Sequence, residues 1–108
     1  AIPGSLVGSE MCIRDSILAA RNVGLYTLVA LQDAIGSLDR VEQVVRTFGM
    51  VNAAPGFTEH PRVIDGFSNL FIDIFGEKGR GARSAVGMSS LPFNIPVEVE
   101  ITIKILVR

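Results

Sequence analysis

Residues 97–107 read VEVEITIKILV, a run in which apolar and polar side chains alternate almost without fault. Every odd-numbered position is valine or isoleucine, and positions 98–104 carry Glu, Glu, Thr and Lys between them. A period of two is typical of a β-strand that has one face against a core. This run therefore predicts a strand whose other face meets solvent or another subunit.

Two helices are expected to cover that strand's apolar face. In residues 61–75, Pro61 suits a first helical turn, and apolar side chains recur every three or four residues, as core positions do. They are Val63, Ile64, Phe67, Leu70, Phe71, Ile74 and Phe75. Residues 17–35 show the same pattern, which Gly36 ends. The expected core side there is Leu18, Leu25, Leu28, Val29, Leu31 and Ile35, opposite Arg21, Asn22, Gln32 and Asp33.

Two further strands complete the predicted fold. Residues 41–53 are apolar on both faces, which is typical of an internal strand covered on both sides. One face is expected to carry Val45, Thr47, Gly49 and Val51, and the other Val44, Phe48 and Met50. A short strand is expected at 83–89. The order helix, strand, helix, strand, strand predicts an α+β fold with two helices on one face of a sheet.

Composition narrows the class of protein. A chain of 108 residues has room for one domain, and 48% hydrophobic with 19% charged residues is typical of a globular domain. A formal charge of −1 gives no basic footprint for nucleic acid, so a nucleic-acid partner is not expected. No apolar run approaches the roughly 18 residues that span a bilayer. With Cys12 as its only cysteine and no secretory signal, the protein is expected to be cytoplasmic.

The first sixteen residues fit neither a helical nor a strand period. The run from Leu6 to Ser16 resembles translated sequencing-adapter read-through, so we predict that residues 1–16 are a non-native segment and that 17–108 are a partial domain. A real N-terminal arm or a cloning remnant is the alternative. On the first interpretation, the only cysteine belongs to the foreign segment.

Candidate chemistry is sparse. The glycine cluster at 76–81 lacks the Gly-Lys-Ser/Thr ending of a phosphate loop and follows a helix instead of preceding one. His60 has no second histidine or cysteine with which to share a metal, so a surface or capping role is expected. Arg83 enters a strand among small residues, where an arginine can hold a carboxylate with two parallel hydrogen bonds, or be an exposed edge charge. Glu98 and Glu100 share a polar strand face and suit acid or base roles, or simple solvation.

The run ARSAVGMSSLP at 82–92, followed by VEVE at 97–100, resembles the signature of the YjgF/RidA family, also called endoribonuclease L-PSP or chorismate mutase-like. The run VNAAPGFT at 51–58 is similar to the longer YjgF-like branch. The resemblance implies a chorismate mutase-like fold and a homotrimer with ligand clefts between subunits. It also implies that the first hairpin, which supplies an aromatic residue and a Ser-Gly site in the family, has no counterpart here.

The resemblance also implies site residues. In deaminating members an arginine binds the substrate carboxylate and a glutamate positions water, and these positions match Arg83 and Glu98; no metal or organic cofactor is implied. Two positions depart from the pattern. An asparagine on the second helix is Asp65 here, which is expected to bring a negative charge near the ligand, and a common cysteine is Ala85.

Three functions follow as hypotheses. The first is a small-carboxylate-binding protein that hydrolyses reactive 2-imino or enamine acids to 2-keto acids and ammonia, which would make it a hydrolase. The second is a ligand-binding or regulatory trimer without turnover, which Asp65 and Ala85 favour. The third is the endoribonuclease activity of the family's older label, against which the absence of a basic stripe argues.

Overall fold

The computed structural model of the chain describes residues 6–107. Its elements follow the predicted order. The helices are α1 (Ile13–Ile35) and α2 (His60–Phe75), and the strands are β1 (Val41–Asn52), β2 (Ala82–Met88) and β3 (Val97–Ile105). Three short 3-10 turns, at Leu38–Arg40, Gly76–Gly79 and Pro92–Asn94, connect them.

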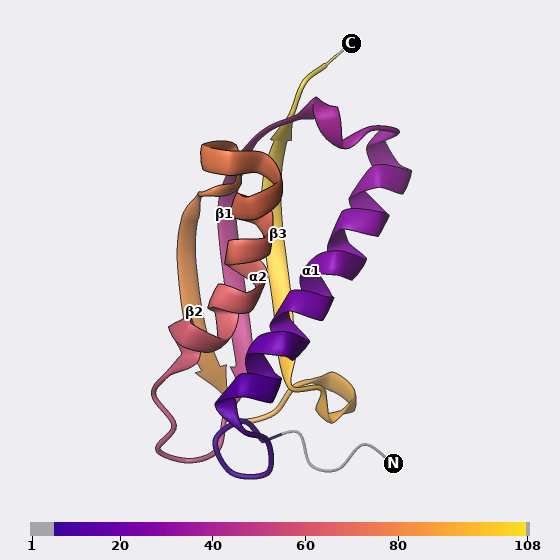
Figure 1. The fold of residues 1–108 in the computed structure, drawn as a ribbon. Helices are drawn as coiled ribbons and strands as arrows, with labels where there is room; N and C mark the ends of the chain where they lie inside the picture. The colour runs from indigo at the N-terminus through magenta and orange to yellow at the C-terminus, as the bar shows by residue number, and fades with distance from the viewer. Residues whose placement is uncertain (1–5, 108) are drawn as a thin grey trace.

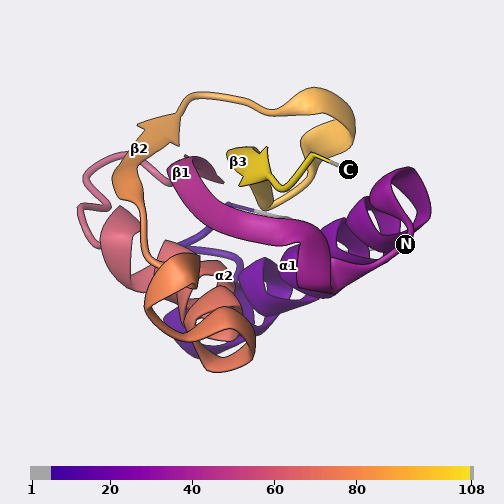
Figure 2. The ribbon, with the colours of Figure 1, turned by 90° about the horizontal axis from the view of Figure 1, so that it is seen from above.

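The three strands form one mixed sheet in the order β2-β1-β3. β1 pairs in parallel with β2 and antiparallel with β3, so β1 is the internal strand that its apolar sequence predicts. Both helices lie on the same side of this sheet, which Figure 1 shows from the front and Figure 2 from above. We call the side toward the helices the helix face and the opposite side the outer face. The α+β prediction, with two helices on one face of a mixed sheet, is confirmed.

α2 forms the centre of the core. Pro61 lies in its first turn, where the missing N–H costs no helical hydrogen bond, and Gly76 follows its last residue with φ 65°, a conformation that glycine adopts without strain. The predicted stripe is buried at Val63, Ile64, Phe67, Leu70 and Phe71. Phe67 stacks on Phe71 with ring centroids 4.6 Å apart. Ile74, predicted as core, is 46% exposed.

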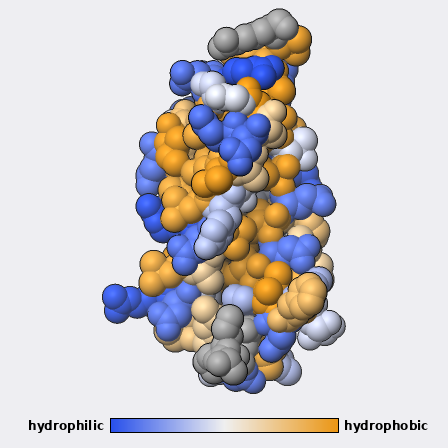
Figure 3. Space-filling model, turned by 90° about the vertical axis from the view of Figure 1, so that its right-hand side faces the viewer, coloured by the Kyte–Doolittle hydropathy of each residue, from blue (hydrophilic) through white to orange (hydrophobic). Residues whose placement is uncertain are grey.

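α1 is amphipathic, but its buried side overlaps the predicted one only in part, at Leu28. Its fully buried residues are Ser16, Ala20, Gly24 and Leu28. The predicted core residues Leu18, Leu25 and Val29 are exposed, together with Tyr26. The side of the molecule to the right of Figure 1 accordingly carries apolar side chains interrupted by charged ones (Figure 3).

Close helix packing explains this rotation of α1. A Cβ added at Gly66 of α2 would lie 2.1 Å from the backbone oxygen of Ile17, and one at Gly24 would lie 2.8 Å from a Leu70 methyl. The two backbones approach so closely that only small residues fit between them. Small side chains therefore occupy the contact, and the larger leucines of α1 lie beside it.

The predicted faces of β1 are wrong in its first half. Val44 is 1% exposed and packs in the core, whereas Val45 is 47% exposed. The register with β3 shifts between Val44 and Arg46, so Val45 is an extra residue of a β-bulge. From Thr47 to Val51 the alternation is regular, and Thr47, Gly49 and Val51 face the helices as predicted.

The segment before α1 contacts the end of β1. Val7 is fully buried, and its N–H donates to the Asn52 oxygen at 2.8 Å, while the Ala54 N–H donates to the Val7 oxygen at 2.9 Å. Cys12 caps α1 through a contact from the Asp15 N–H to its Sγ. The prediction that residues 1–16 are non-native stays a prediction, and its first five residues lie outside the described part of the chain.

Within residues 6–107, no helix combines the length and apolar character needed to cross a membrane.

Candidate functional site

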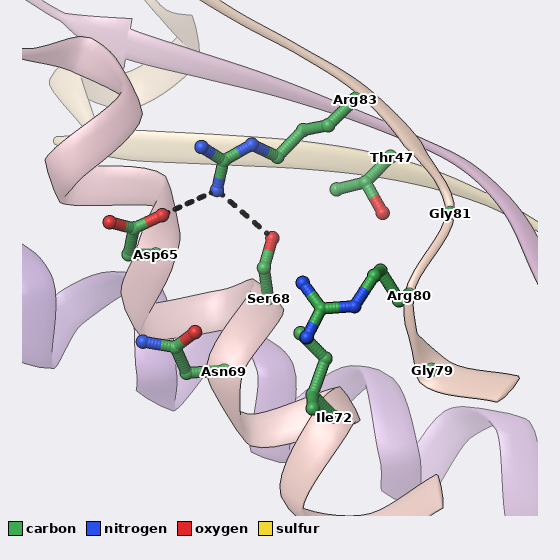
Figure 4. A pocket seen from close by; sticks show the side chains of 9 residues that line it. All are labelled: Thr47, Asp65, Ser68, Asn69, Ile72, Gly79, Arg80, Gly81 and Arg83. Atoms are coloured by element: carbon green, nitrogen blue, oxygen red, sulfur yellow. Dashed lines mark hydrogen bonds and ion pairs between the residues drawn. The ribbon is translucent and has the colours of Figure 1, made fainter. Parts of the chain in front are cut away.

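An open cavity of about 360 Å³ lies on the helix face, between α2 and the residues that lead into β2 (Figure 4). Its volume is in the range of ordinary small-molecule pockets. The walls are mainly polar, and Ile72 is the large apolar side chain among them. Such a cavity suits a small polar ligand.

α2 supplies one wall through residues spaced three and four apart. Asp65, Ser68 and Asn69 lie at positions i, i+3 and i+4 of the helix, so they share one side of it. This polar side is adjacent to the buried apolar stripe of the same helix. The fold therefore anchors these three side chains by burying the neighbouring face of α2.

Arg83 lies above the cavity, near the start of β2. Its Nη1 donates to Asp65 Oδ1 at 2.7 Å and to Ser68 Oγ at 3.3 Å, and its side chain is 28% exposed. Both hydrogens of Nη1 are thereby used. Within residues 6–107, Nε and Nη2 have no hydrogen-bond partner. The Nε/Nη2 edge of the Arg83 guanidinium is therefore free among the described residues, while Nη1 is held by Asp65 and Ser68.

Asp65 carries a negative charge beside the cavity, and that charge is paired with Arg83. A carboxylate 2.7 Å from a guanidinium nitrogen orients it and leaves the Nε/Nη2 edge available. The pair is partly exposed, with Asp65 at 46%, so its contribution is to position Arg83 more than to stabilise the fold.

Thr47 of β1 forms the back of the cavity, directly opposite Arg83 in the parallel register. The residue is 5% exposed, and within the described part of the chain its hydroxyl has no hydrogen-bond partner. In Figure 4 this hydroxyl points toward Arg80. A hydroxyl without a protein partner at a cavity wall can donate to water or to a ligand.

Arg80 closes the cavity on the side away from Asp65. The Gln43 amide donates to the Arg80 oxygen at 2.9 Å, and the Arg80 N–H donates to the Glu77 oxygen at 3.1 Å, so its backbone is fixed. Its side chain is 60% exposed, and its Nε donates to Glu77 Oε2 at 3.3 Å. The two Nη groups have no partner among residues 6–107.

The glycines beside Arg80 have a packing role. A Cβ on Gly79 would lie 2.2 Å from the Phe71 oxygen, and one on Gly81 would lie 2.4 Å from the Val44 oxygen. Only glycine allows the chain to pass this close to α2 and β1. The cluster therefore shapes the cavity wall.

Ala85 and Glu98 lie elsewhere relative to Arg83. Ala85 is two residues further along β2 on the same face, where its methyl group packs against the core. Glu98 pairs with Met50 and lies between Val97 and Val99, both of which pack on the helix face, so Glu98 points to the outer face. A single chain brings Asp65 to Arg83 but does not bring Glu98 to it.

No group of three or more His, Cys, Asp or Glu residues in the described range 6–107 is placed to hold a metal ion. His60 begins α2 and packs edge-on against Phe57, with ring centroids 5.4 Å apart.

Five residues of the cavity were not found as site residues from the sequence: Thr47, Ser68, Asn69, Ile72 and Arg80. Ser68 had a usable signal, because it lies three residues after Asp65 in a predicted helix. Arg80 lies three residues before Arg83, but it belongs to a glycine-rich connection, where the spacing of two residues does not determine where their side chains point. Thr47 carried no signal, since threonine is common in strands.

The chain resembles known proteins both in its sequence and in its fold. A family model described as "YjgF/chorismate mutase-like, putative endoribonuclease" matches residues 3–103. Protein TCP17 of Trypanosoma cruzi is 40% identical over 100 residues, which cover 92% of this chain; the chain spans 62% of that relative's length.

Two solved structures share the fold. The crystal structure of Atu1372, a protein of unknown function from Agrobacterium tumefaciens, matches with a TM-score of 0.91 and 39% identity, over 97% of this chain and 68% of that one. The crystal structure of a putative endoribonuclease from Shewanella oneidensis matches with a TM-score of 0.90 and 29% identity, over 96% and 69%. The chain belongs to the YjgF/chorismate mutase-like family.

Proposed function

We propose that this protein binds small carboxylic acids at Arg83. The observation that carries the proposal is that only one nitrogen of the Arg83 guanidinium is engaged. Asp65 and Ser68 accept hydrogen bonds from Nη1, and the Nε/Nη2 edge has no partner among residues 6–107. Two parallel N–H donors match the two oxygens of a carboxylate. Because the guanidinium is already oriented, binding loses less side-chain freedom.

The reaction that we propose for this site is the hydrolysis of 2-imino or enamine acids. Water adds to the C=N carbon, the C–N bond breaks, and a 2-keto acid and ammonia leave. Holding the carboxylate fixes the imine carbon relative to an attacking water, and a nearby carboxylate can take the proton of that water. No cofactor takes part in this scheme.

Glu98 can serve as that carboxylate only from a second copy of the chain. β2 and β3 are separated by β1, so they lie about 10 Å apart, and Glu98 is on the outer face while Arg83 is on the helix face. The homotrimer implied by the family resemblance provides neighbouring copies. The hydrolytic function therefore requires the assembly, whereas carboxylate binding requires only Arg83.

The test uses freshly generated 2-aminoacrylate. We expect the 108-residue chain to accelerate keto-acid release above the spontaneous rate, and Arg83→Ala to remove the acceleration. Arg62→Ala is the matched control, since Arg62 is an exposed arginine of α2 paired with Glu59 outside the cavity. Equal rates of keto-acid release with and without protein would exclude the hydrolysis. If butyrate binding still depended on Arg83, the protein would bind carboxylates without turnover.

Endoribonuclease activity is the second candidate, because the matching family model and the Shewanella protein are both described by that name. The formal charge of −1 offers little attraction to an RNA backbone, so we rank it second. RNA cleavage by the purified chain that survives Arg83→Ala would favour it over carboxylate chemistry.

A further inference from the structure

The cavity beneath Arg83 contains hydrogen-bond donors that the proposed carboxylate site does not use. In Figure 4 the free Nε/Nη2 edge of Arg83 points away from the cavity, and the side chains of Thr47, Ser68 and Arg80 surround the space on the other side of its guanidinium. These donors can bind a group other than the carboxylate proposed at the free edge of Arg83.

Each of these three side chains has a proton to donate. Ser68 Oγ accepts from Arg83, so its own hydrogen is free. The Thr47 hydroxyl has no hydrogen-bond partner in the described residues although the residue is only 5% exposed, and the Nη groups of Arg80 are free there as well. Asp65 is the acidic residue that lines the cavity, and its Oδ1 accepts from Arg83.

The charge balance favours an anion. The charged residues that line the cavity are Asp65, Arg80 and Arg83, which give a net charge of +1. Glu77 contacts Arg80 from outside, but its side chain is 84% exposed, so water screens that pair. Donors from two hydroxyls and a guanidinium around a small space suit an oxyanion.

We propose that this cavity is an oxyanion subsite, in which Arg80, Thr47 and Ser68 bind a carboxylate or phosphate group. The group belongs to a separate small anion, because the free edge of Arg83 points away from this cavity and one short diacid cannot reach both sides of the guanidinium. The subsite therefore does not depend on the proposed carboxylate binding at Arg83.

The experiment measures dissociation constants of butyrate and inorganic phosphate by calorimetry. The proteins are the full chain, Arg80→Gln, Thr47→Val and the control Arg62→Gln. We expect Arg80→Gln to weaken phosphate binding roughly 10- to 100-fold without changing butyrate binding, and Arg62→Gln to change neither.

Thr47→Val separates a binding role from a structural one. Replacing this unpaired hydroxyl by a methyl group of the same shape should leave the melting temperature of the free protein unchanged or raise it. It should also weaken the anion roughly 2- to 10-fold. A variant that loses stability and keeps its affinity would assign Thr47 to the fold alone.

The proposal is overturned if phosphate does not bind or if Arg80→Gln leaves its binding unchanged. Failure of the Arg83 site looks different: Arg83→Gln would then leave butyrate binding unaltered or butyrate would not bind, whatever phosphate does. The two hypotheses can therefore fail independently.

Discussion

The two faces of the same three-stranded sheet differ in what they hold. On the helix face, Val51 and the apolar side chains of β3 pack in the core beneath the two helices, and the cavity opens beside α2. On the outer face, β3 presents Glu98, Glu100, Thr102 and Lys104, and Arg46 of β1 lies over the Phe48 ring at 5.1 Å. One face is a core with a polar cavity at its margin, and the other is charged and amphipathic.

This difference shows how strand alternation decides which residues can act together. Arg83 and Glu98 look like partners in the sequence because they match one family site. In the fold they point to opposite sides of a sheet. Residues on one face form a site within a chain, and residues on two faces form one only between chains.

The largest difference in stability between the two faces is expected from replacing one phenylalanine on each of them. Phe67 of α2 is fully buried under the helix face, so Phe67→Ala should cost about 3–5 kcal/mol of unfolding free energy. Phe48 is half-buried on the outer face, and Phe48→Ala should cost less than half as much. Urea denaturation of both variants measures the difference. Equal losses would mean that the outer face is also a core, covered by something other than this chain.

A smaller loss of unfolding free energy is expected from a substitution where β1 passes under α2. A Cβ on Gly49 would lie 2.5 Å from Ile64 Cγ1, so Gly49→Ala should destabilise the chain by about 1–3 kcal/mol through overpacking. Ile64→Ala removes the atoms that clash. The double variant should therefore lose less stability than the sum of the two single variants, and strict additivity would show that the strand and helix do not meet there.

The smallest effect is expected from an ion pair on the outer face. Lys104 Nζ lies 2.7 Å from Glu42 Oε2, and this hydrogen bond and charge raise the pKa of Lys104 above its usual 10.5. A raised pKa in the folded state adds stability that is fully present below pH 10.5 and disappears as the pH rises through the folded-state pKa. The melting temperature of Lys104→Gln should lie slightly below that of the unaltered chain at about pH 8, and the gap should close at higher pH. A gap that widens above pH 10.5 would contradict this assignment.

Most of the fold followed from periodicity, and the exceptions have local causes. The strand and helix order, the internal position of β1 and the buried stripe of α2 were all predictable because apolar spacing reports burial directly. The buried side of α1 was not. Hydropathy favoured Leu25 and Val29, but the approach of the Gly66 backbone to Ile17 requires small residues at the contact.

The site was predictable in part. Arg83 stood out by its small neighbours and its family match, and the structure places Asp65 beside it. The role of Asp65 depends on which guanidinium nitrogen it contacts, which no sequence pattern reports. Thr47 and Arg80 join the cavity through strand pairing and a glycine-rich approach, both of which are tertiary properties.

The bulge at Val45 also determines where this chain can change length. Val45 is the unpaired residue between Val44 and Arg46, so deleting it would leave Val44 toward the helices and Thr47 in the cavity. A deletion between 46 and 51 would instead exchange the two faces of β1 on one side of the cut. The register with β3 also shifts between Val41 and Gln43, so among relatives of this chain single-residue insertions and deletions in β1 should be tolerated before Arg46 and rare from Arg46 to Val51.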